Sequence, residues 1–300
     1  MDQIVRLDQV DAYNRMRGVV TRHPLVTVLD LSKAEAMPAR TFRFGLYAVF
    51  LKELVCGELS YGRSHYDYQE GTLVFVGPGQ VPSVQPKVQT FQPKGWALLF
   101  HPDLIKGTPL GRQIQQYSFF SYSVNEALHL SEAERQTVLE CFRKVSDELS
   151  NPVDRHTRTL ITTSILLLLD YCQRYYERQF ITREDAHRGT LQKFESMLNE
   201  YLDSDVPMDS GLPTVAYFAE RLHLSTNYFG DLIRRESGVS AQSFIQDRLI
   251  ETAKERMFDP EASISEIAYG LGFRYPQHFT RLFRQKVGMP PNEYRQAIGN

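Results

Sequence analysis

The sequence predicts a multidomain α+β protein in which an antiparallel β-barrel or sandwich precedes a helical segment and a C-terminal all-α domain. Three observations predict this order. Glycines separate short strand-like stretches before about residue 125, amphipathic helical patterns follow, and a helix-turn-helix pattern occurs twice near the C-terminus. A chain of 300 residues is long enough for two ordinary domains, each with its own core.

Composition limits the function without naming a partner. Hydrophobic residues make up 42% of the chain and charged residues 23%, values typical of a soluble globular protein. The net charge is −2. Beyond residue 212 there are 11 Lys and Arg against 10 Asp and Glu, which is less basic than most nucleic-acid-binding domains. Any surface that binds a polyanion must therefore be local.

The chain has no segment that predicts export or membrane insertion. No apolar run approaches the roughly 20 residues of a membrane-spanning helix. The first 18 residues contain several charges and lack the apolar segment of a signal peptide. The widely spaced Cys56, Cys141 and Cys172 predict reduced, buried thiols and neither a disulfide framework nor a zinc site. We expect a cytoplasmic protein.

Residues 1–125 are expected to form the β domain. Apolar residues alternate through residues 42–50, which is typical of a half-buried strand. Glycines then divide the sequence into further short strands, with a turn at 77–79 and a strand at 95–100. Tyr66, Tyr68 and Trp96 are weak candidates for lining a small-molecule pocket, although aromatic residues in strands more often belong to the core.

Residues 126–203 are expected to be helical. Ser131 and Glu134 have the spacing of a capping box. The next helix has an apolar middle, so it either joins two copies of the chain as a homodimer or packs against its own barrel. A third amphipathic helix ends near residue 203. Residues 204–212 are polar and contain proline and glycine, which predicts a linker before a domain at 213–300.

The same pattern occurs twice after this linker, in residues 215–238 and 264–288. Each copy predicts a short helix, a turn, and a second helix with apolar residues at i, i+3 and i+4. Helices that cross steeply need a small residue at their closest approach, and Ala219 and Ala268 occupy that position. The residues between the copies predict a long helix that holds both motifs at a fixed spacing.

The two turns differ, but both second helices have clear start signals. Gly272 suits a left-handed turn conformation, whereas its counterpart His223 tolerates that conformation less well. Ser225 is a good N-cap for the second helix of the first motif. Pro276 stands at the first position of the corresponding helix, where its fixed φ fits and no amide hydrogen is lost.

The second helix of the second motif has a cationic face. With Phe279 and Phe283 toward the core, the opposite face carries guanidinium and amide groups and no carboxylate. Most charged helix faces are only solvated, but arginine can pair with guanine and glutamine with adenine. We expect double-stranded DNA as the partner, with contacts from Ser225, Thr226, Asn227, Asp231, Arg234, Arg235, Arg274, Gln277, Arg281, Arg284, Gln285 and Lys286.

The two motifs are expected to share this work unequally. Asp231 stands where the second motif has Arg281. Phosphate repels a carboxylate, and among the bases it can accept only from the amino group of cytosine. Arg274 and Lys286 suit phosphate contacts. The second motif is therefore expected to supply more of the affinity.

The last third of the chain resembles the DNA-binding domain of the AraC/XylS family of bacterial transcription regulators. The resemblance rests on Arg248, Leu249 and Ala253, on ISEIAYGLGF at 264–273, on HFTRLFRQKVGMPPNEYR at 278–295, and on Ser225, Phe229 and Gly238. It implies two helix-turn-helix units that read successive major-groove segments. The strand pattern of residues 1–125 is similar to the cupin-like sensor barrel of many members. That likeness implies a small-molecule effector. From the apolar helices we expect a homodimer formed through residues 126–203, and RNA polymerase is a partner if the protein is an activator.

Two other functions are considered. The barrel could be a structural or protein-interaction module without an effector. A metal-dependent cupin enzyme is the distant alternative, because metal-binding cupins resemble a pattern with an HxH pair, a Glu and a later His. The matching region has only His65, with His101 as a single later histidine. Hydrolase and phosphate-binding motifs are absent from the sequence. We expect no enzymatic activity, no metal and no cofactor.

Overall fold

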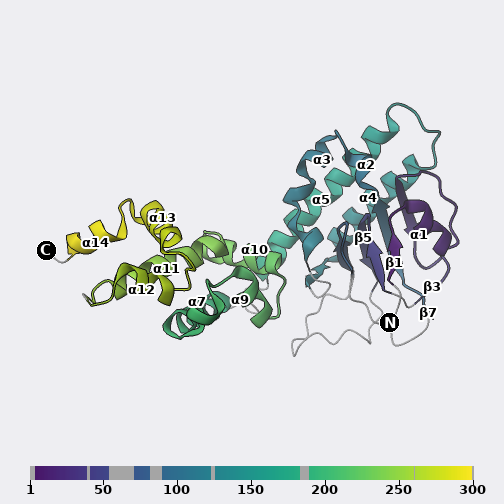
Figure 1. The fold of residues 1–300 in the computed structure, drawn as a ribbon. Helices are drawn as coiled ribbons and strands as arrows, with labels where there is room; N and C mark the ends of the chain where they lie inside the picture. The colour runs from purple at the N-terminus through teal and green to yellow at the C-terminus, as the bar shows by residue number, and fades with distance from the viewer. Residues whose placement is uncertain are drawn as a thin grey trace. The chain divides into compact units, whose positions relative to one another are not determined.

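A computed structural model describes residues 4–38, 41–53, 71–81, 90–122, 126–182, 189–259 and 261–298. The chain divides into two compact units, Met1–Arg183 and Glu184–Asn300, which are described separately (Figure 1). The first unit combines sheets with helices and the second is helical. No helix among the described residues is long and apolar enough to cross a membrane.

The main sheet of the first unit has five antiparallel strands in the order β2-β8-β5-β6-β9. Two small sheets accompany it, a parallel pair of β1 with β4 and an antiparallel pair of β3 with β7. The strands are β1 (Val5–Leu7), β2 (Val26–Asp30), β3 (Met37–Pro38), β4 (Phe42–Phe44), β5 (Tyr47–Lys52), β6 (Thr72–Val76), β7 (Thr90–Phe91), β8 (Gly95–Phe100) and β9 (Leu128–His129). Within the described residues the main sheet is open, since β2 and β9 are its two edges. The expected closed barrel therefore stays a prediction.

The apolar alternation through residues 42–50 belongs to two strands and a bend. Phe44 and Leu46 are buried on one face of the fold together with Ala48. The bend at Gly45 separates β4 from β5, and the Gly45 N–H donates to the Leu7 carbonyl at 2.9 Å. In β5 the alternation ends, because Val49 is also fully buried. A central strand covered on both faces loses the half-buried pattern that the sequence predicts.

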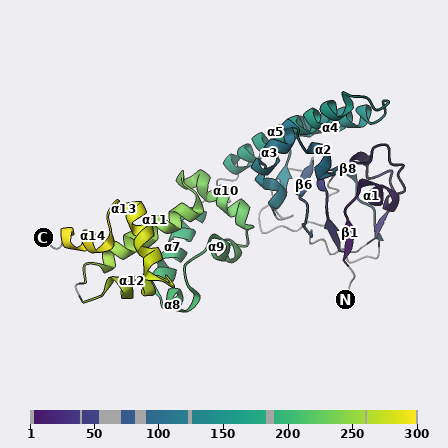
Figure 2. The same cartoon turned by 45° about the horizontal axis from the view of Figure 1, so that its top comes forward.

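Helices of the first unit lie along the main sheet (Figures 1 and 2). They are α1 (Val10–Met16), α2 (Pro102–Ile105), α3 (Pro109–Gln113), two 3₁₀ turns at Ile114–Gln116 and Ser118–Ser121, α4 (Glu132–Glu148) and α5 (Thr157–Thr182). The expected capping box is present at the start of α4, where Ser131 and Glu134 each accept from the other's backbone N–H. It fixes the helix start at the predicted position.

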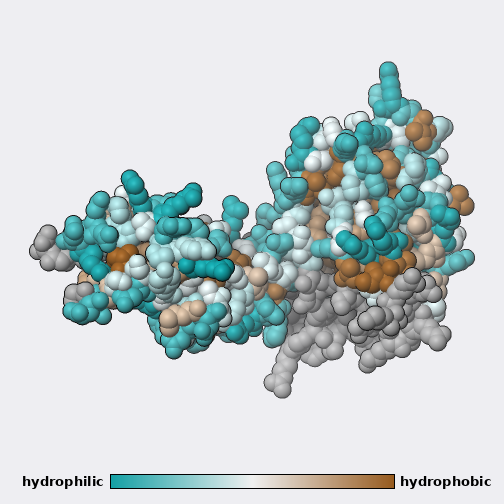
Figure 3. All heavy atoms as spheres, in the orientation of Figure 1, coloured by the Kyte–Doolittle hydropathy of each residue, from teal (hydrophilic) through white to brown (hydrophobic). Residues whose placement is uncertain are grey.

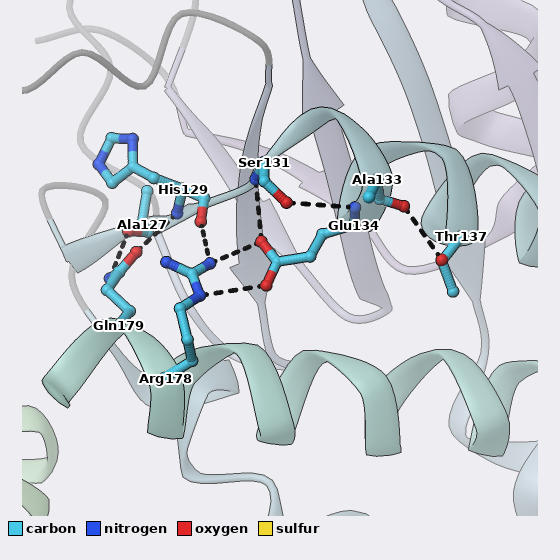
Figure 4. Close-up of polar contacts among 8 residues, drawn as sticks. All are labelled: Ala127, His129, Ser131, Ala133, Glu134, Thr137, Arg178 and Gln179. Carbon is cyan, nitrogen blue, oxygen red and sulfur yellow. Dashed lines mark hydrogen bonds and ion pairs between the residues drawn. The ribbon is translucent and has the colours of Figure 1, made fainter. Parts of the chain in front are cut away.

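An arginine on α5 joins this cap to the sheet edge (Figure 4). Arg178 donates from Nη2 and Nε to the two carboxylate oxygens of Glu134, at 2.7 and 3.1 Å. Its Nη2 also donates to the His129 carbonyl of β9 at 2.8 Å. The neighbouring Gln179 bridges the Ala127 carbonyl and the His129 N–H. The C-terminal part of α5 is thus tied to its own unit by charge-assisted bonds.

Helix α5 also buries most of its apolar residues in its own unit, where it packs against α3, α4 and β9. Ile165, Leu169 and Cys172 are fully buried. Two leucines remain outward, Leu160 at 52% and Leu167 at 40% exposure. In Figure 3 small groups of hydrophobic residues show over the part of this unit that holds α2, α3 and α5, and a larger hydrophobic patch lies over the strands near β5 and β1. Packing within its own unit explains why the buried face of α5 is apolar. It does not explain the leucines at 160 and 167, which are apolar although exposed.

The second unit contains the two predicted motifs around a shared core. Its helices are α7 (Thr190–Asp203), α8 (Val206–Ser210), α9 (Val215–Arg221), α10 (Thr226–Ser237), α11 (Ala241–Arg256), α12 (Ile264–Gly270), α13 (Pro276–Val287) and α14 (Pro291–Ile298). Ala219 and Ala268, the predicted close-approach residues, are 1% and 0% exposed. The predicted long connecting helix is α11.

The boundary between the units differs from the expected linker at 204–212. Helix α7 belongs to the second unit, since Phe194, Leu198 and Leu202 are fully buried in the core of the two motifs. Residues 206–210 form α8, and Gly211 accepts a hydrogen bond from the Tyr201 hydroxyl at 2.9 Å. Proline and glycine here cap and turn a packed segment, which composition alone does not distinguish from a linker.

Candidate nucleic-acid interface

The two motifs have the same backbone turn. In the first, the Leu224 N–H donates to the Ala219 carbonyl at 2.9 Å, and in the second Phe273 donates to Ala268 at 3.0 Å. His223 takes the left-handed conformation with a φ of 57°, and Gly272 takes it with a φ of 91°. The motifs are therefore one local structure with different residues at the strained position.

Packing explains why the second turn has glycine. A Cβ at residue 272 would lie 2.5 Å from the carbonyl carbon and oxygen of Gly211 and 2.9 Å from the Leu212 nitrogen. The segment after α8 thus lies directly against the second turn. His223 is exposed, so its side chain reaches solvent while its backbone keeps the same conformation.

The outer helices begin as the sequence predicts. The Ser225 hydroxyl accepts from the Tyr228 N–H at 3.2 Å at the start of α10, and Pro276 is the first residue of α13. Both helices end at a left-handed glycine, Gly238 with a φ of 78° and Gly288 with a φ of 89°.

Helix α13 presents the predicted cationic face to solvent. Phe279 and Phe283 are fully buried. Four predicted contact residues lie on the opposite side, fully or partly exposed: Gln277, Arg281, Arg284 and Gln285. No acid occurs within α13, and Arg274 is exposed just before it. The helix therefore offers donors for base edges and phosphates without a competing carboxylate.

Two exposed aromatic rings beside this face are not among the predicted contact residues. Tyr275 and His278 lie with ring centroids 5.7 Å apart, and the Arg274 guanidinium lies 6.0 Å from the Tyr275 ring. Tyr275 is 50% exposed. Tyr275 stands directly before the proline that begins α13. That position is the sequence signal that could have indicated that the candidate interface extends to these two rings.

Lys286 is a predicted contact residue with a clear partner inside the chain. Its Nζ lies 2.7 Å from Asp247 Oδ1 and donates to the Ser243 hydroxyl at 3.0 Å. Both partners belong to α11, so the ammonium group links α13 to the connecting helix. The sequence indicated a phosphate contact for this lysine, and the structure gives it an internal role as well.

Helix α10 offers a different face. Thr226, Asn227, Arg234 and Arg235 lie toward solvent, and Asp231 is half-buried. Tyr228, the counterpart of the exposed His278, is 1% exposed. The first motif thus combines a carboxylate with arginines where the second has only cations and amides.

Gly230 interrupts the outward side of α10, one helical turn from both Thr226 and Arg234. Its φ is not positive, so the conformation is open to any residue. Apart from its two chain neighbours and the nearby backbone of α10, a Cβ built there comes within 4 Å of no described atom. A mid-helix glycine destabilises a helix by roughly 0.5–1 kcal/mol relative to alanine.

Two arginines of α11 hold α7 against the motifs. Arg248 Nε donates to Asn199 Oδ1 at 2.7 Å. Arg256 donates from Nη2 to the Leu202 carbonyl at the end of α7, and from Nη1 to the Gly270 carbonyl at the end of α12, the latter at 3.0 Å. A cation at helix C-termini pairs with their unsatisfied carbonyls. Arg256 therefore fixes α7 and the second motif to the same point of α11.

The candidate ligand and metal residues of the first unit are only partly described. Trp96 lies on β8 between Asp30 of β2 and Leu51 of β5 and is half-buried. Tyr66, Tyr68 and His65 lie outside the described residues. His101 caps α2, because its Nδ1 accepts from the Asp103 N–H at 3.1 Å. Among the described residues no group of three His, Cys, Asp or Glu could hold a metal ion.

The comparison with protein families matches part of the helical unit. Residues 218–297 match a family described as a helix-turn-helix domain. YobQ of Bacillus subtilis, an uncharacterized HTH-type transcriptional regulator, is 26% identical over 133 residues, which cover 40% of this chain and 54% of YobQ. The regulatory protein PocR of Salmonella typhimurium is 31% identical over 98 residues, covering 33% of this chain and 31% of PocR.

A solved structure, the C-terminal domain of the two-component response regulator yesN from Fusobacterium nucleatum, is 21% identical with a TM-score of 0.30. The match covers 34% of the present chain and 98% of the yesN domain chain. The chain spans about half or less of the length of these curated relatives.

Proposed function

We propose, from the premise that residues 218–297 form an AraC-type helix-turn-helix domain, that the chain is a sequence-specific DNA-binding transcription regulator. The exposed face of α13 carries this proposal. It combines Arg281 and Arg284 with two glutamines on a helix without acids, anchored by fully buried phenylalanines. A polyanionic partner explains why a solvated helix face lacks carboxylates, because the phosphates would repel them.

The chemistry of this face fits the major groove. The groove is about 12 Å wide and admits an α-helix, where arginine can donate twice to guanine and glutamine can bond adenine. Arg274 precedes the helix and suits a phosphate. We assign base contacts to the residues of α13 and α10 that the sequence indicates, and phosphate contacts to their ends.

The second motif supplies more of the affinity in this proposal. Asp231 stands where α13 has Arg281, and Glu236 stands where it has Lys286. Each of these acids weakens the attraction of the first motif to phosphate. The first motif is then suited to discriminate between sequences through Asn227 and Arg234.

Control by a small-molecule effector in the first unit is the finer part of the proposal, with a structural or protein-interaction role as the alternative. An effector acts only if it binds two arrangements of the chain with different affinity. A thermal-shift screen of the full chain against metabolites tests this. A ligand at 100 times its Kd should stabilise its unit by about 2.7 kcal/mol, and a broad screen without any shift favours the alternative. RNA polymerase is a further partner if the protein activates transcription.

A homodimer through α5 is also proposed. Leu160 and Leu167 lie on one side of α5, two turns apart, and are half-exposed after the helix has packed in its own unit. A second copy would cover both. Light scattering at micromolar concentration should give a dimer for the wild type and a monomer for Leu160→Glu with Leu167→Glu. Val20→Glu, at another exposed apolar residue of this unit, should stay dimeric. A monomeric wild type would refute the dimer.

The direct test of function is binding by the full chain. Duplexes are selected from a random pool, and the wild type and Arg281→Ala are titrated against a selected and a random duplex over a range of salt. Arg281→Ala should cost about 1–3 kcal/mol on the selected duplex and relax preference locally. The control is Arg221→Ala, because that guanidinium is stacked on Tyr217 at 4.1 Å and lies outside the two contact helices. Failure to select any duplex would refute the proposal.

A further inference from the structure

Gly230 is the feature of the second unit that the fold itself does not explain. Other glycines of this unit have an internal reason. Gly272 has a positive φ and a backbone neighbour 2.5 Å from where a Cβ would lie, while Gly238 and Gly288 end helices in the left-handed conformation. Gly230 has no positive φ, and apart from its two chain neighbours and the nearby backbone of α10 no described atom lies within 4 Å of the place that a Cβ would take.

The second motif shows that this position accepts a side chain. Aligning Phe229 with Phe279 makes Thr280 the counterpart of Gly230. Thr280 is β-branched and half-buried, and its hydroxyl donates to the Pro276 carbonyl at 3.1 Å in an intact helix. The helix-turn-helix fold therefore does not require glycine here. Glycine weakens α10 without an internal benefit, since alanine is the better helix former.

The surroundings of Gly230 indicate what the missing side chain makes room for. On the helix surface its neighbours at i−4, i−3 and i+4 are Thr226, Asn227 and Arg234, and all three lie toward solvent. These are a hydroxyl, an amide and a guanidinium, groups that donate to base edges and phosphates. Gly230 is thus a gap in the middle of a row of predicted contact residues.

We infer that Gly230 is a specificity-determining position at which the backbone of α10 approaches a DNA strand closely. Without a Cβ, the helix can come nearer to the strand by the thickness of a methyl group, which brings Asn227 and Arg234 within bonding distance of base edges. The inference rests on the proposed function. In it, α10 binds DNA through close steric fit, whereas α13 binds DNA through its positive charge.

The test uses the full-length protein and a duplex selected from a random pool by the wild type. Gly230→Ala should weaken binding to the selected duplex by about tenfold or more, which corresponds to about 1.4 kcal/mol. The same substitution should raise the melting temperature of the helical unit by a few degrees, since alanine favours the helix. Opposite changes in affinity and stability are the signature of a residue kept for contact.

Thr280→Ala is the matched control, because it leaves a methyl group at the same position of the other motif. It should change affinity by less than Gly230→Ala. Gly230→Val should bind more weakly than Gly230→Ala, as expected for a steric limit. Unchanged affinity of Gly230→Ala would overturn the inference while leaving the proposed function intact. A lower melting temperature of Gly230→Ala would also overturn it, because the fold would then require glycine. If the wild type selects no duplex, the proposed function fails and this inference fails with it.

Discussion

Lys286 Nζ lies 2.7 Å from Asp247 Oδ1, so the last cation of α13 is tied to the connecting helix α11. The Ser243 hydroxyl accepts from the same ammonium group and lies 3.4 Å from the Asp247 carboxylate. The side chains of Lys286 and Asp247 are 22% and 52% exposed. This contact sets the position of α13 relative to α11, and with it the direction of the cationic face.

Lys286→Ala should therefore act on stability more than on phosphate binding. A partly exposed ion pair contributes about 0.2–1 kcal/mol, and we expect a loss of that size in thermal unfolding. The slope of the logarithm of the DNA-binding constant against the logarithm of salt concentration should change by less than about one unit. Asp247→Asn distinguishes the two roles. If Lys286 only contacts phosphate, removing its internal partner should strengthen DNA binding; if it braces α13, Asp247→Asn should destabilise the unit as Lys286→Ala does.

The helical unit should fold alone only when α7 is included. Phe194, Leu198 and Leu202 are fully buried among the residues of both motifs, and burying each such side chain contributes about 1.5–3 kcal/mol. A fragment of residues 189–300 should show helical circular dichroism and cooperative melting. A fragment that begins at residue 205, within the linker that the sequence predicts, should melt at a much lower temperature or stay unfolded. Equal stability of the two fragments would contradict the place of α7 in this core.

The two turns should respond in opposite ways to exchange of their left-handed residue. Gly272→Ala puts a Cβ 2.5 Å from Gly211 at a φ of 91°, and should destabilise the unit by about 1–3 kcal/mol. His223→Gly removes a side chain from the same conformation with little loss of packing. It should be neutral or stabilising by up to about 1 kcal/mol. Melting curves of the two variants check both, and a strongly destabilised His223→Gly would mean that the imidazole has a structural role.

Arg256→Ala should loosen α7 and the second motif together. The guanidinium donates to the Leu202 and Gly270 carbonyls, and hydrogen bonds from charged groups contribute about 1.5–3 kcal/mol each. Amide hydrogen exchange should accelerate at the C-terminal ends of both α7 and α12. Arg256→Lys should rescue little, because one ammonium nitrogen cannot reproduce the two separate donors of the guanidinium. Arg248→Ala, which loses the bonds to Asn199 on α7 and to Glu255 on α11, is the control; it should affect α7 and leave α12 unchanged. Faster exchange in α7 alone after Arg256→Ala would contradict the prediction that Arg256 holds the ends of both helices.

The sequence by itself determined the two helix-turn-helix motifs, their caps and the cation-only face of α13. Those features are local: a repeat with period-3.6 apolar residues, a serine and a proline at helix starts, and an absence of acids are all visible within about 25 residues. The sequence also indicated that His223 and Gly272 occupy equivalent turns. The motif, its register and the chemistry of its exposed face follow from neighbours along the chain.

Only the tertiary structure decided which unit α7 belongs to, why Gly272 must lack a side chain, and which partner Lys286 has. Each depends on residues far apart in sequence: Phe194 against Phe229, Gly272 against Gly211, and Lys286 against Asp247. The same holds for β5, whose central place in the sheet buries both faces and removes the alternation expected of it. Periodicity shows that a residue has a buried side, but the element that covers it is set by long-range packing, which no local pattern contains.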